Sequence, residues 1–329
     1  MRWKKLGMGI AAGLLATSLL FGCGGGGGKS GDPGNKPGQT AASSQAKRSV
    51  EPTATFKYGE KTARLYAVKS PKLSAEIASN RNSSSRGRMV LMQDSIYVAD
   101  VGGKDIQLLR IPLKDETAGD PAAVAKLRYS ASIATNGKVV VYQSEENKGT
   151  VGIFDGQKAA VGGEWPGASY IVGIAGTDKF VNNAANTIQM LTLADGKFTK
   201  QVVLEDYSDI SGLGSATLQP VYADEQELYF EYEVEKGDAD VPCLIALDHK
   251  GKEVRRFEGI GETWADWAVT KDYVVKVASK GDVQIFERAT GKEIAKAVVK
   301  DFHPMKLCLL KDNSILVCDT DAKLFILDL

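Results

Sequence analysis

Residues that commonly carry out acid–base or metal chemistry are scarce in this chain of 329 residues. It contains two histidines, His249 and His303, and neither has histidine or cysteine neighbours at the spacing of a zinc site. The carboxylates at 206–209 and 238–240 lack the spacing of a calcium-binding loop. No catalytic residue, metal site or cofactor is therefore predicted. Paired carboxylates alone can hydrolyse a glycosidic bond, so an enzyme stays an alternative.

Carboxylates and aromatic side chains recur together in four segments between apolar runs, at 163–169, 205–212, 259–264 and 301–304. These segments contain no lysine or arginine. An acidic surface with aromatic anchors suits a basic protein segment, a cationic ligand or a glycan. The candidate binding face consists of Trp165, Asp206, Tyr207, Asp209, Glu262, Trp264 and Asp301. The alternative is that the acidic loops are merely solvated and that Trp264 packs in the core.

The N-terminus has the organisation of a secretory signal, because basic residues precede the uncharged apolar run 6–21. That run ends at Leu20-Phe21-Gly22-Cys23, which resembles the lipobox of bacterial lipoproteins. The resemblance implies that residues 1–22 are removed and that Cys23 carries diacylglycerol, often with a further acyl group on the new N-terminus. Several acyl chains anchor a protein stably to a membrane. The alternatives are an ordinary signal peptide and an uncleaved anchor.

Residues 23–52 are rich in glycine, serine, proline and lysine and lack the apolar side chains that offset chain entropy on folding. We expect a disordered tether with a root-mean-square reach of roughly 30 Å. The folded domain is expected at 53–329. The chain is thus predicted to be extracytoplasmic and lipid-anchored to the cell membrane or the outer membrane.

Charge is unevenly distributed although the formal net charge is zero. Residues 1–90 contain 15 Lys+Arg and 4 Asp+Glu, whereas the remainder contains 26 and 37. The basic part lies next to the expected anchor, where anionic lipids attract lysine and arginine. The acidic body offers no basic face to neutralise phosphates, which argues against a nucleic-acid partner.

A short apolar run returns six times along the body. Its equivalent positions, spaced by 43, 41, 48, 46 and 41 residues, are Ile96, Val139, Phe180, Leu228, Val274 and Ile315. Such a period with β-type runs is typical of a propeller with four strands per blade. The sequence therefore predicts an all-β, six-bladed β-propeller of antiparallel blades. Two stacked β-sandwiches are the competing fold, which the near-constant period disfavours.

The fifth repeat is the clearest, with runs at 265–269, 273–277, 283–288 and 293–299. The last repeat contains three runs only. A spare strand at 63–68 precedes the first blade. We expect this N-terminal strand to close the ring by pairing with the last blade, which would cover an exposed sheet edge.

Segments 244–254 and 283–294 resemble the strand–turn–strand part of quinoprotein-type propeller repeats, in which a short segment such as Thr-Gly-Lys turns the chain. The resemblance implies a propeller of such repeats. The family's docking tryptophan is missing after the Gly-Lys turn, where Val254 and Ile294 stand, so no quinone is predicted. Lipoproteins of this broad type include an outer-membrane assembly scaffold, an analogy for architecture.

Three cysteines lie in the body: Cys243, Cys308 and Cys318. Cys308 and Cys318 flank a predicted hairpin, in a register that places them diagonal to each other. This is poor disulfide geometry, so we predict buried free thiols.

These features together predict a membrane-anchored extracytoplasmic lipoprotein whose propeller is a protein-binding or scaffold module of the cell envelope. One alternative is a propeller hydrolase or lyase that acts on envelope or extracellular polysaccharide. Another is a lipoprotein that senses a small ligand. A central pocket lined by converging acids would favour the enzyme, and a broad open face would favour the scaffold.

Overall fold

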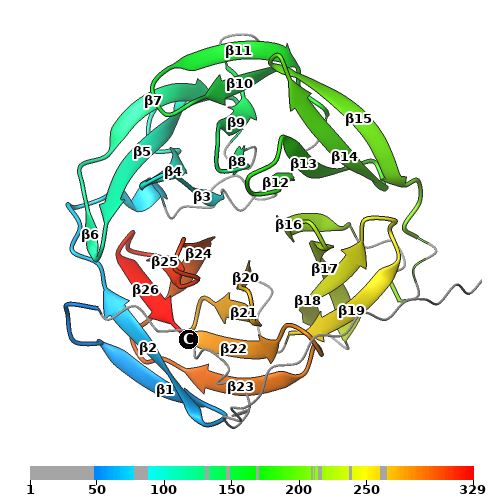
Figure 1. The fold of residues 1–329 in the computed structure, drawn as a ribbon. Helices are drawn as coiled ribbons and strands as arrows, with labels where there is room; N and C mark the ends of the chain where they lie inside the picture. Colours follow the sequence, from blue (N-terminus) through cyan, green and yellow to red (C-terminus); the bar gives the residue numbers. More distant parts are fainter. Residues whose placement is uncertain are drawn as a thin grey trace, which may run out of the picture. The chain divides into compact units, whose positions relative to one another are not determined.

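The computed structural model describes residues 48–77, 88–129, 133–145, 149–167, 170–208, 210, 212–213, 217–236, 239–259 and 265–329. All of them belong to one compact unit, Gln45–Leu329. Six antiparallel sheets are arranged around a central axis (Figure 1). The predicted six-bladed β-propeller is therefore confirmed.

The strands of the first three blades follow one another outward from the axis. Blade 1 consists of β3 (Met89–Met92), β4 (Ser95–Asp100), β5 (Ile106–Lys114), β6 (Thr117–Ala118) and β7 (Ala122–Leu127). Blade 2 consists of β8 (Ile133–Thr135), β9 (Val140–Gln143), β10 (Thr150–Phe154) and β11 (Ala159–Glu164). Blade 3 consists of β12 (Ile171–Gly173), β13 (Lys179–Ala184), β14 (Thr187–Ala194) and β15 (Lys197–Leu204).

The other three blades have the same order, with one addition at the end of the chain. Blade 4 consists of β16 (Gln219–Ala223), β17 (Glu227–Lys236), β18 (Ala239–Asp248) and β19 (Glu253–Glu258). Blade 5 consists of β20 (Ala265–Val269), β21 (Tyr273–Ala278), β22 (Asp282–Glu287) and β23 (Glu293–Val298). Blade 6 consists of β24 (Pro304–Leu309), β25 (Ile315–Asp319), β26 (Leu324–Asp328), β2 (Lys61–Ala67) and β1 (Ala54–Tyr58). The short 3-10 helix η1 (Ala75–Ile77) precedes blade 1.

Apolar side chains are packed between the blades, because each sheet presents both faces to its neighbours. Every residue of β25 is buried, whereas the outer strand β15 is mostly exposed. Six hydrophobic clusters result, one for each pair of adjacent blades. Near the axis the blades approach closely, since a Cβ atom added to Gly173 would lie 2.2 Å from the Thr135 carbonyl oxygen of the neighbouring blade.

Blade 6 joins the two ends of the folded chain. Strand β2 pairs with β26 in antiparallel register, with Arg64 opposite Asp328, and β1 pairs with the outer edge of β2. β2 corresponds to the spare strand at 63–68. β1 is an outer strand that the sequence analysis did not foresee, and it gives blade 6 five strands instead of four. Pairing between the first and last segments covers the edge of β26.

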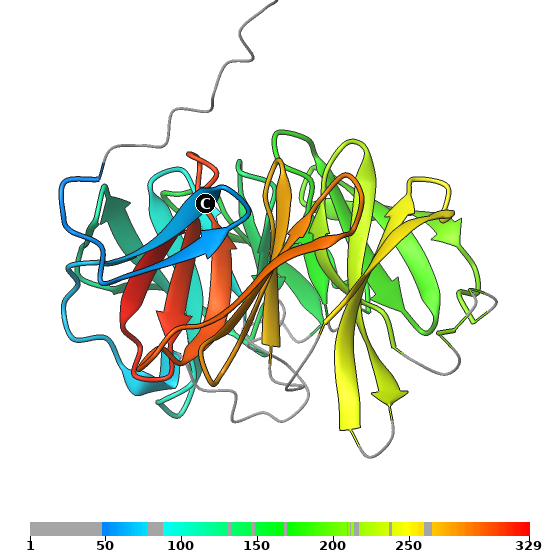
Figure 2. The same ribbon diagram turned by 90° about the horizontal axis from the view of Figure 1, so that it is seen from below.

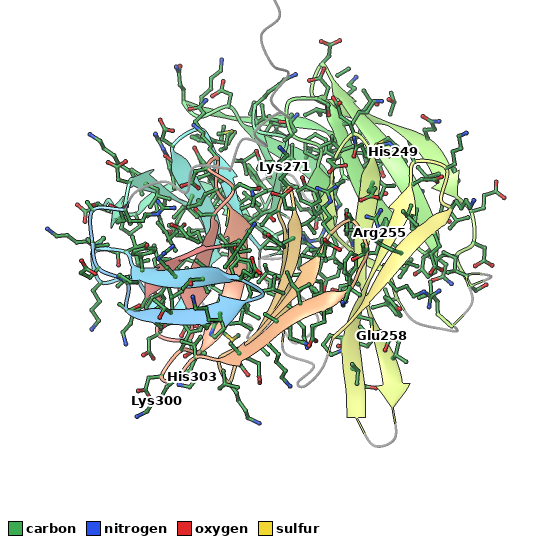
Figure 3. All side chains as sticks on the ribbon, turned by 60° about the horizontal axis from the view of Figure 1, so that its bottom comes forward. His249, Arg255, Glu258, Lys271, Lys300 and His303 are labelled. Atoms are coloured by element: carbon green, nitrogen blue, oxygen red, sulfur yellow. The ribbon has the colours of Figure 1, made fainter. Side chains whose placement is uncertain are left out.

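The meandering blades give the ring two different faces (Figure 2). We call turn face the one that carries the turns between first and second strands and between third and fourth strands. The crossover face carries the connections between blades and the turns between second and third strands. Figure 3 labels His249 and Lys271 near the turn face, and Lys300 and His303 near the crossover face.

Candidate binding face and central channel

The four acidic segments lie in connections between successive blades. These connections follow β11, β15, β19 and β23, so the meander brings all four to the crossover face. A common face is a consequence of topology: each connection runs from an outer strand to the innermost strand of the next blade.

The described carboxylates of these four segments are exposed to solvent: Glu164, Glu205, Asp206 and Asp301. None of them forms an ion pair with another described residue. Asp206 Oδ1 accepts the Ser208 N–H at 2.9 Å, and this backbone hydrogen bond lowers the pKa of the Asp206 carboxyl. Asp301 has φ of 56°, a left-handed conformation that aspartate tolerates better than most residues. These four carboxylates are therefore exposed without an ion pair to another described residue.

The expectation that Trp165 and Tyr207 are exposed anchors is corrected by the structure. Trp165 is 6% exposed and packs in the cluster between blades 2 and 3. Tyr207 is 1% exposed; its hydroxyl accepts from Asn183 Nδ2 at 3.0 Å and donates to Asn186 Oδ1 at 3.2 Å. A large ring gains more from burial between blades than from solvent exposure. Both residues shape the connections and leave the carboxylates as the exposed groups.

Four residues of the prediction lie outside the described residues: the proposed lipid-bearing Cys23, and Asp209, Glu262 and Trp264 of the candidate face. The tether and the signal segment up to residue 47 lie outside them too.

A cavity of about 230 Å³ occupies the centre of the ring. The innermost strands of all six blades line it, from β3 to β24. Its polar and aromatic lining residues include Arg88, Tyr170, Tyr222, Glu231, Asp266 and Trp267. Asp266 is used within the fold, because its carboxylate accepts the Trp267 N–H at 2.9 Å and the Leu307 N–H at 2.7 Å. The second of these bonds joins blades 5 and 6.

Arg88 spans the channel at its crossover-face end. The residue directly precedes β3 of blade 1, and its guanidinium donates to the Pro220 and Val221 carbonyl oxygens of β16 in blade 4. These strands lie on opposite sides of the axis (Figure 1). The guanidinium also lies 5.9 Å from the ring centroid of Tyr170. Sequence analysis missed Arg88, since it ends a polar stretch with no periodic pattern.

Several charged groups on the turn face form ion pairs between neighbouring blades. Lys311 of blade 6 contacts Asp94 of blade 1 at 2.7 Å, and Lys138 of blade 2 contacts Asp178 of blade 3 at 3.0 Å. The guanidinium of Arg288 in blade 5 forms ion pairs with both Asp224 and Glu227 of blade 4. These ion pairs join adjacent blades directly and therefore stabilise the closed ring.

Two lysines are buried at the crossover-face ends of the strands. Burial lowers the pKa of Lys276 to about 8 and that of Lys306 to about 8. Lys306 Nζ donates to the Ile77 carbonyl oxygen at the end of η1. Next to Lys306, burial raises the pKa of Cys318 to about 12. Cys308 and Cys318 are buried free thiols in diagonal positions of one hairpin, as predicted.

Two further findings concern the described residues alone. No three histidine, cysteine or carboxylate side chains among them converge as a metal site requires. Within the same residues, no helix has the length and apolar character needed to cross a membrane.

Comparison with known proteins identifies a likeness of fold. No protein-family model matches the chain, and no curated protein matches it. The solved structures that resemble it include BamB from Moraxella catarrhalis, with 12% identity, a TM-score of 0.41, and coverage of 73% of this chain and 82% of that one. The computationally designed Ika8 protein has 17% identity, a TM-score of 0.42, and coverage of 73% and 69%.

The WD40 β-propeller domain of Doa1 is also similar, with 10% identity, a TM-score of 0.44, and coverage of 84% of this chain and 96% of that one. At such identities a shared fold does not imply a shared function. The six sheets of the chain itself identify it as a β-propeller.

Proposed function

We propose that the chain is a membrane-anchored extracytoplasmic scaffold of the cell envelope, which binds a basic segment of a protein partner on its crossover face. The observation that carries this proposal is the group of exposed carboxylates without ion pairs in the connections between blades. On the crossover face Glu205, Asp206 and Asp301 are exposed without ion pairs to other described residues. A basic segment of a partner protein could therefore form ion pairs with these carboxylates.

The start of the tether supports this assignment of the face. Arg48 is the first described residue, and its guanidinium donates to Asp328 Oδ1 at 2.8 Å, Asp312 Oδ2 at 2.7 Å and Ser314 Oγ at 2.8 Å. Asp312 and Ser314 belong to the turn between β24 and β25, on the turn face. Arg48 therefore fixes this end of the tether to the turn face and leaves the connections on the crossover face uncovered by it.

Crosslinking in cells tests the proposal when it uses two variants with matched charge changes. Glu205→Gln combined with Asp301→Asn removes two negative charges from the crossover face. Glu225→Gln combined with Asp272→Asn removes two from exposed positions on the turn face. We expect the crossover-face variant to lose the crosslinked partner and the turn-face variant to retain it. The interaction should weaken with added salt, because exposed charges are screened.

Equal loss of the partner from both variants would contradict the assignment of the face. A partner retained by both would place the contact elsewhere on the ring. The anchor is tested separately with Cys23→Ala: the unsubstituted chain should sediment with membranes, and the variant should not. Sedimentation of both with membranes would refute the lipid anchor without bearing on the face.

A further inference from the structure

The central hairpin of blade 4 projects beyond the ring on the crossover face (yellow in Figure 2). Its strands β17 and β18 contain ten residues each, whereas β16 contains five and β19 six. The pairing of β16 with β17 ends at Glu231, and that of β18 with β19 ends at Cys243. Beyond these points, residues 233–236 and 239–242 pair only with each other among the described strands. Each of the two strands therefore has an edge there without a described strand partner.

The edge of β17 presents complete backbone hydrogen-bonding groups. The Glu227 carbonyl oxygen accepts the Asp224 N–H at 3.0 Å across the turn from β16, so this group points away from β18. Backbone groups alternate in direction along a strand, and the pairing of β17 with β18 continues without a register shift. The N–H and C=O groups of Glu235 therefore point to the same edge as those of Glu227, beyond the end of β16.

The edge of β18 is less suited to a further strand. It contains Pro242, which has no N–H to donate. A Cβ atom added to Gly259 would lie 2.2 Å from the Pro242 carbonyl oxygen, so the chain after β19 already lies against this edge. Proline is one of the residues that prevent pairing at an exposed strand edge. Strand addition to the projecting hairpin is thus favoured at β17.

The charge around this edge indicates what kind of strand it would take. Residues 231–242 contain five acidic residues and one lysine. Glu233 and Asp240 of the hairpin are exposed. Because β16 is the innermost strand of blade 4, the edge of β17 faces the axis and the connections between blades, among them the one that carries Glu205 and Asp206. A strand in this place would lie among carboxylates, so lysine and arginine side chains suit it.

We propose that an extended basic segment of the partner protein adds as a further strand to the inner edge of β17, beside residues 233–236. This inference rests on the proposed function, because it assigns a mode of binding to the basic segment on the crossover face. Backbone hydrogen bonds hold the added strand, and its basic side chains select it by charge. A second copy of this hairpin does not fit, because it carries the same negative charge.

Isothermal titration of the full chain at low salt tests strand addition with two peptides of equal charge. The probe is a heptapeptide of alternating lysine and valine, and the control is the same peptide with a methyl group on every backbone nitrogen. We expect saturable binding of the probe and at least about tenfold weaker binding of the control, because the control cannot donate backbone hydrogen bonds.

Equal affinities for the two peptides would overturn strand addition and leave the binding of basic segments, and with it the proposed function, in place. Failure of both peptides to bind would also overturn strand addition. The crosslinked partner and its dependence on Glu205 and Asp301 test the proposed function independently of either peptide.

Two substitutions of one residue locate the added strand. Glu235→Pro removes a negative charge and the N–H at the edge of β17, whereas Glu235→Gln removes the charge alone. The N–H lost in the proline variant points away from β18, so the hairpin keeps its own hydrogen bonds. We expect the proline variant to bind the probe about tenfold more weakly than the glutamine variant does. Equal affinities of the two variants would refute the role of this edge.

Should the proline variant not fold, NMR of the unsubstituted chain decides. On titration with the probe, the Glu235 N–H signal should shift and its exchange with solvent should slow, because the N–H acquires an acceptor. The Val234 N–H, which faces β18, is the internal control and should change little. A Glu235 N–H signal that neither shifts nor becomes protected would overturn the proposal.

Discussion

The two faces of the ring use their polar residues differently. On the turn face, Lys311 and Asp94 join blades 6 and 1, and Asn136 Nδ2 donates to the Thr177 carbonyl oxygen of the next blade at 2.8 Å. On the crossover face, the ion pair of Lys126 with Asp105 stays within blade 1. The exposed carboxylates of the connections between blades have no such partner. The turn face thus carries ion pairs that join neighbouring blades, and the exposed carboxylates in the connections between blades have no ion pair to another described residue.

The first and largest expected effect concerns the cluster around Arg48. Its side chain is 7% exposed, and it neutralises Asp328, which is also buried. Arg48→Ala should reduce the free energy of unfolding by about 3 kcal/mol or more, because removal of one partner leaves a buried charge uncompensated. Urea unfolding at pH 7 measures this. Arg48→Lys retains the charge and should cost less; a loss below about 1 kcal/mol for the alanine variant would contradict the importance of this cluster.

A second variant compares the faces directly. Asn136 is 2% exposed, and its Oδ1 accepts the Lys138 and Val139 N–H groups at 3.0 and 3.1 Å. Asn136→Ala should destabilise the protein by about 1–3 kcal/mol, since buried partners lose their bonds. Glu205→Gln with Asp301→Asn on the crossover face should change stability by less than about 0.5 kcal/mol. Thermal unfolding of both variants measures the difference in stability. Equal losses of stability would contradict the conclusion that the turn face contributes more to the stability of the ring than the exposed carboxylates do.

The smallest expected effect is a pH dependence at the crossover-face end of blade 6. Burial lowers the pKa of Lys306 to about 8 from its ordinary value of 10.5, so the folded protein releases this proton at lower pH than the unfolded chain does. The unfolded chain binds more protons between these values, and the contribution of Lys306 to stability therefore rises with pH in that window. Relative to Lys306→Met, the unsubstituted protein should gain on the order of 1 kcal/mol between pH 7 and pH 9.

Urea unfolding of both proteins at several pH values isolates the contribution of Lys306, because other titrating groups are common to the two. Parallel curves across this range would show that Lys306 does not titrate as its burial requires. A relative fall in the stability of the unsubstituted protein would contradict the sign of the shift.

The repeat could be recognised in the sequence because the second strand of each blade is buried on both faces. Ile96, Phe180, Leu228, Val274 and Ile315 all lie in second strands and are each fully buried. A strand enclosed by two neighbouring blades has to be apolar along its whole length, which leaves a periodic signal. The outer strand β1 has alternating burial and one strand partner, and it left no such signal.

The candidate face was predicted in part. The meander requires connections between blades to share a face, so the positions of Asp206 and Asp301 followed from the repeat. The burial of Trp165 and Tyr207 did not follow, because an aromatic residue in a connection can pack inward or project outward. The choice depends on the space between two blades, as for Tyr207, which fills a site beside Asn183 and Leu218.

The sequence by itself determined the number of blades, the order of their strands and the side on which the connections lie, because these depend on local apolar runs and on the length of the repeat. Only the tertiary structure decided the roles of Arg48 and Arg88. Arg48 reaches residues 264 to 280 positions away, and Arg88 reaches across the axis to positions 132 and 133 residues further on. Contacts of this kind exist only after the ring has formed, so no local sequence pattern predicts them.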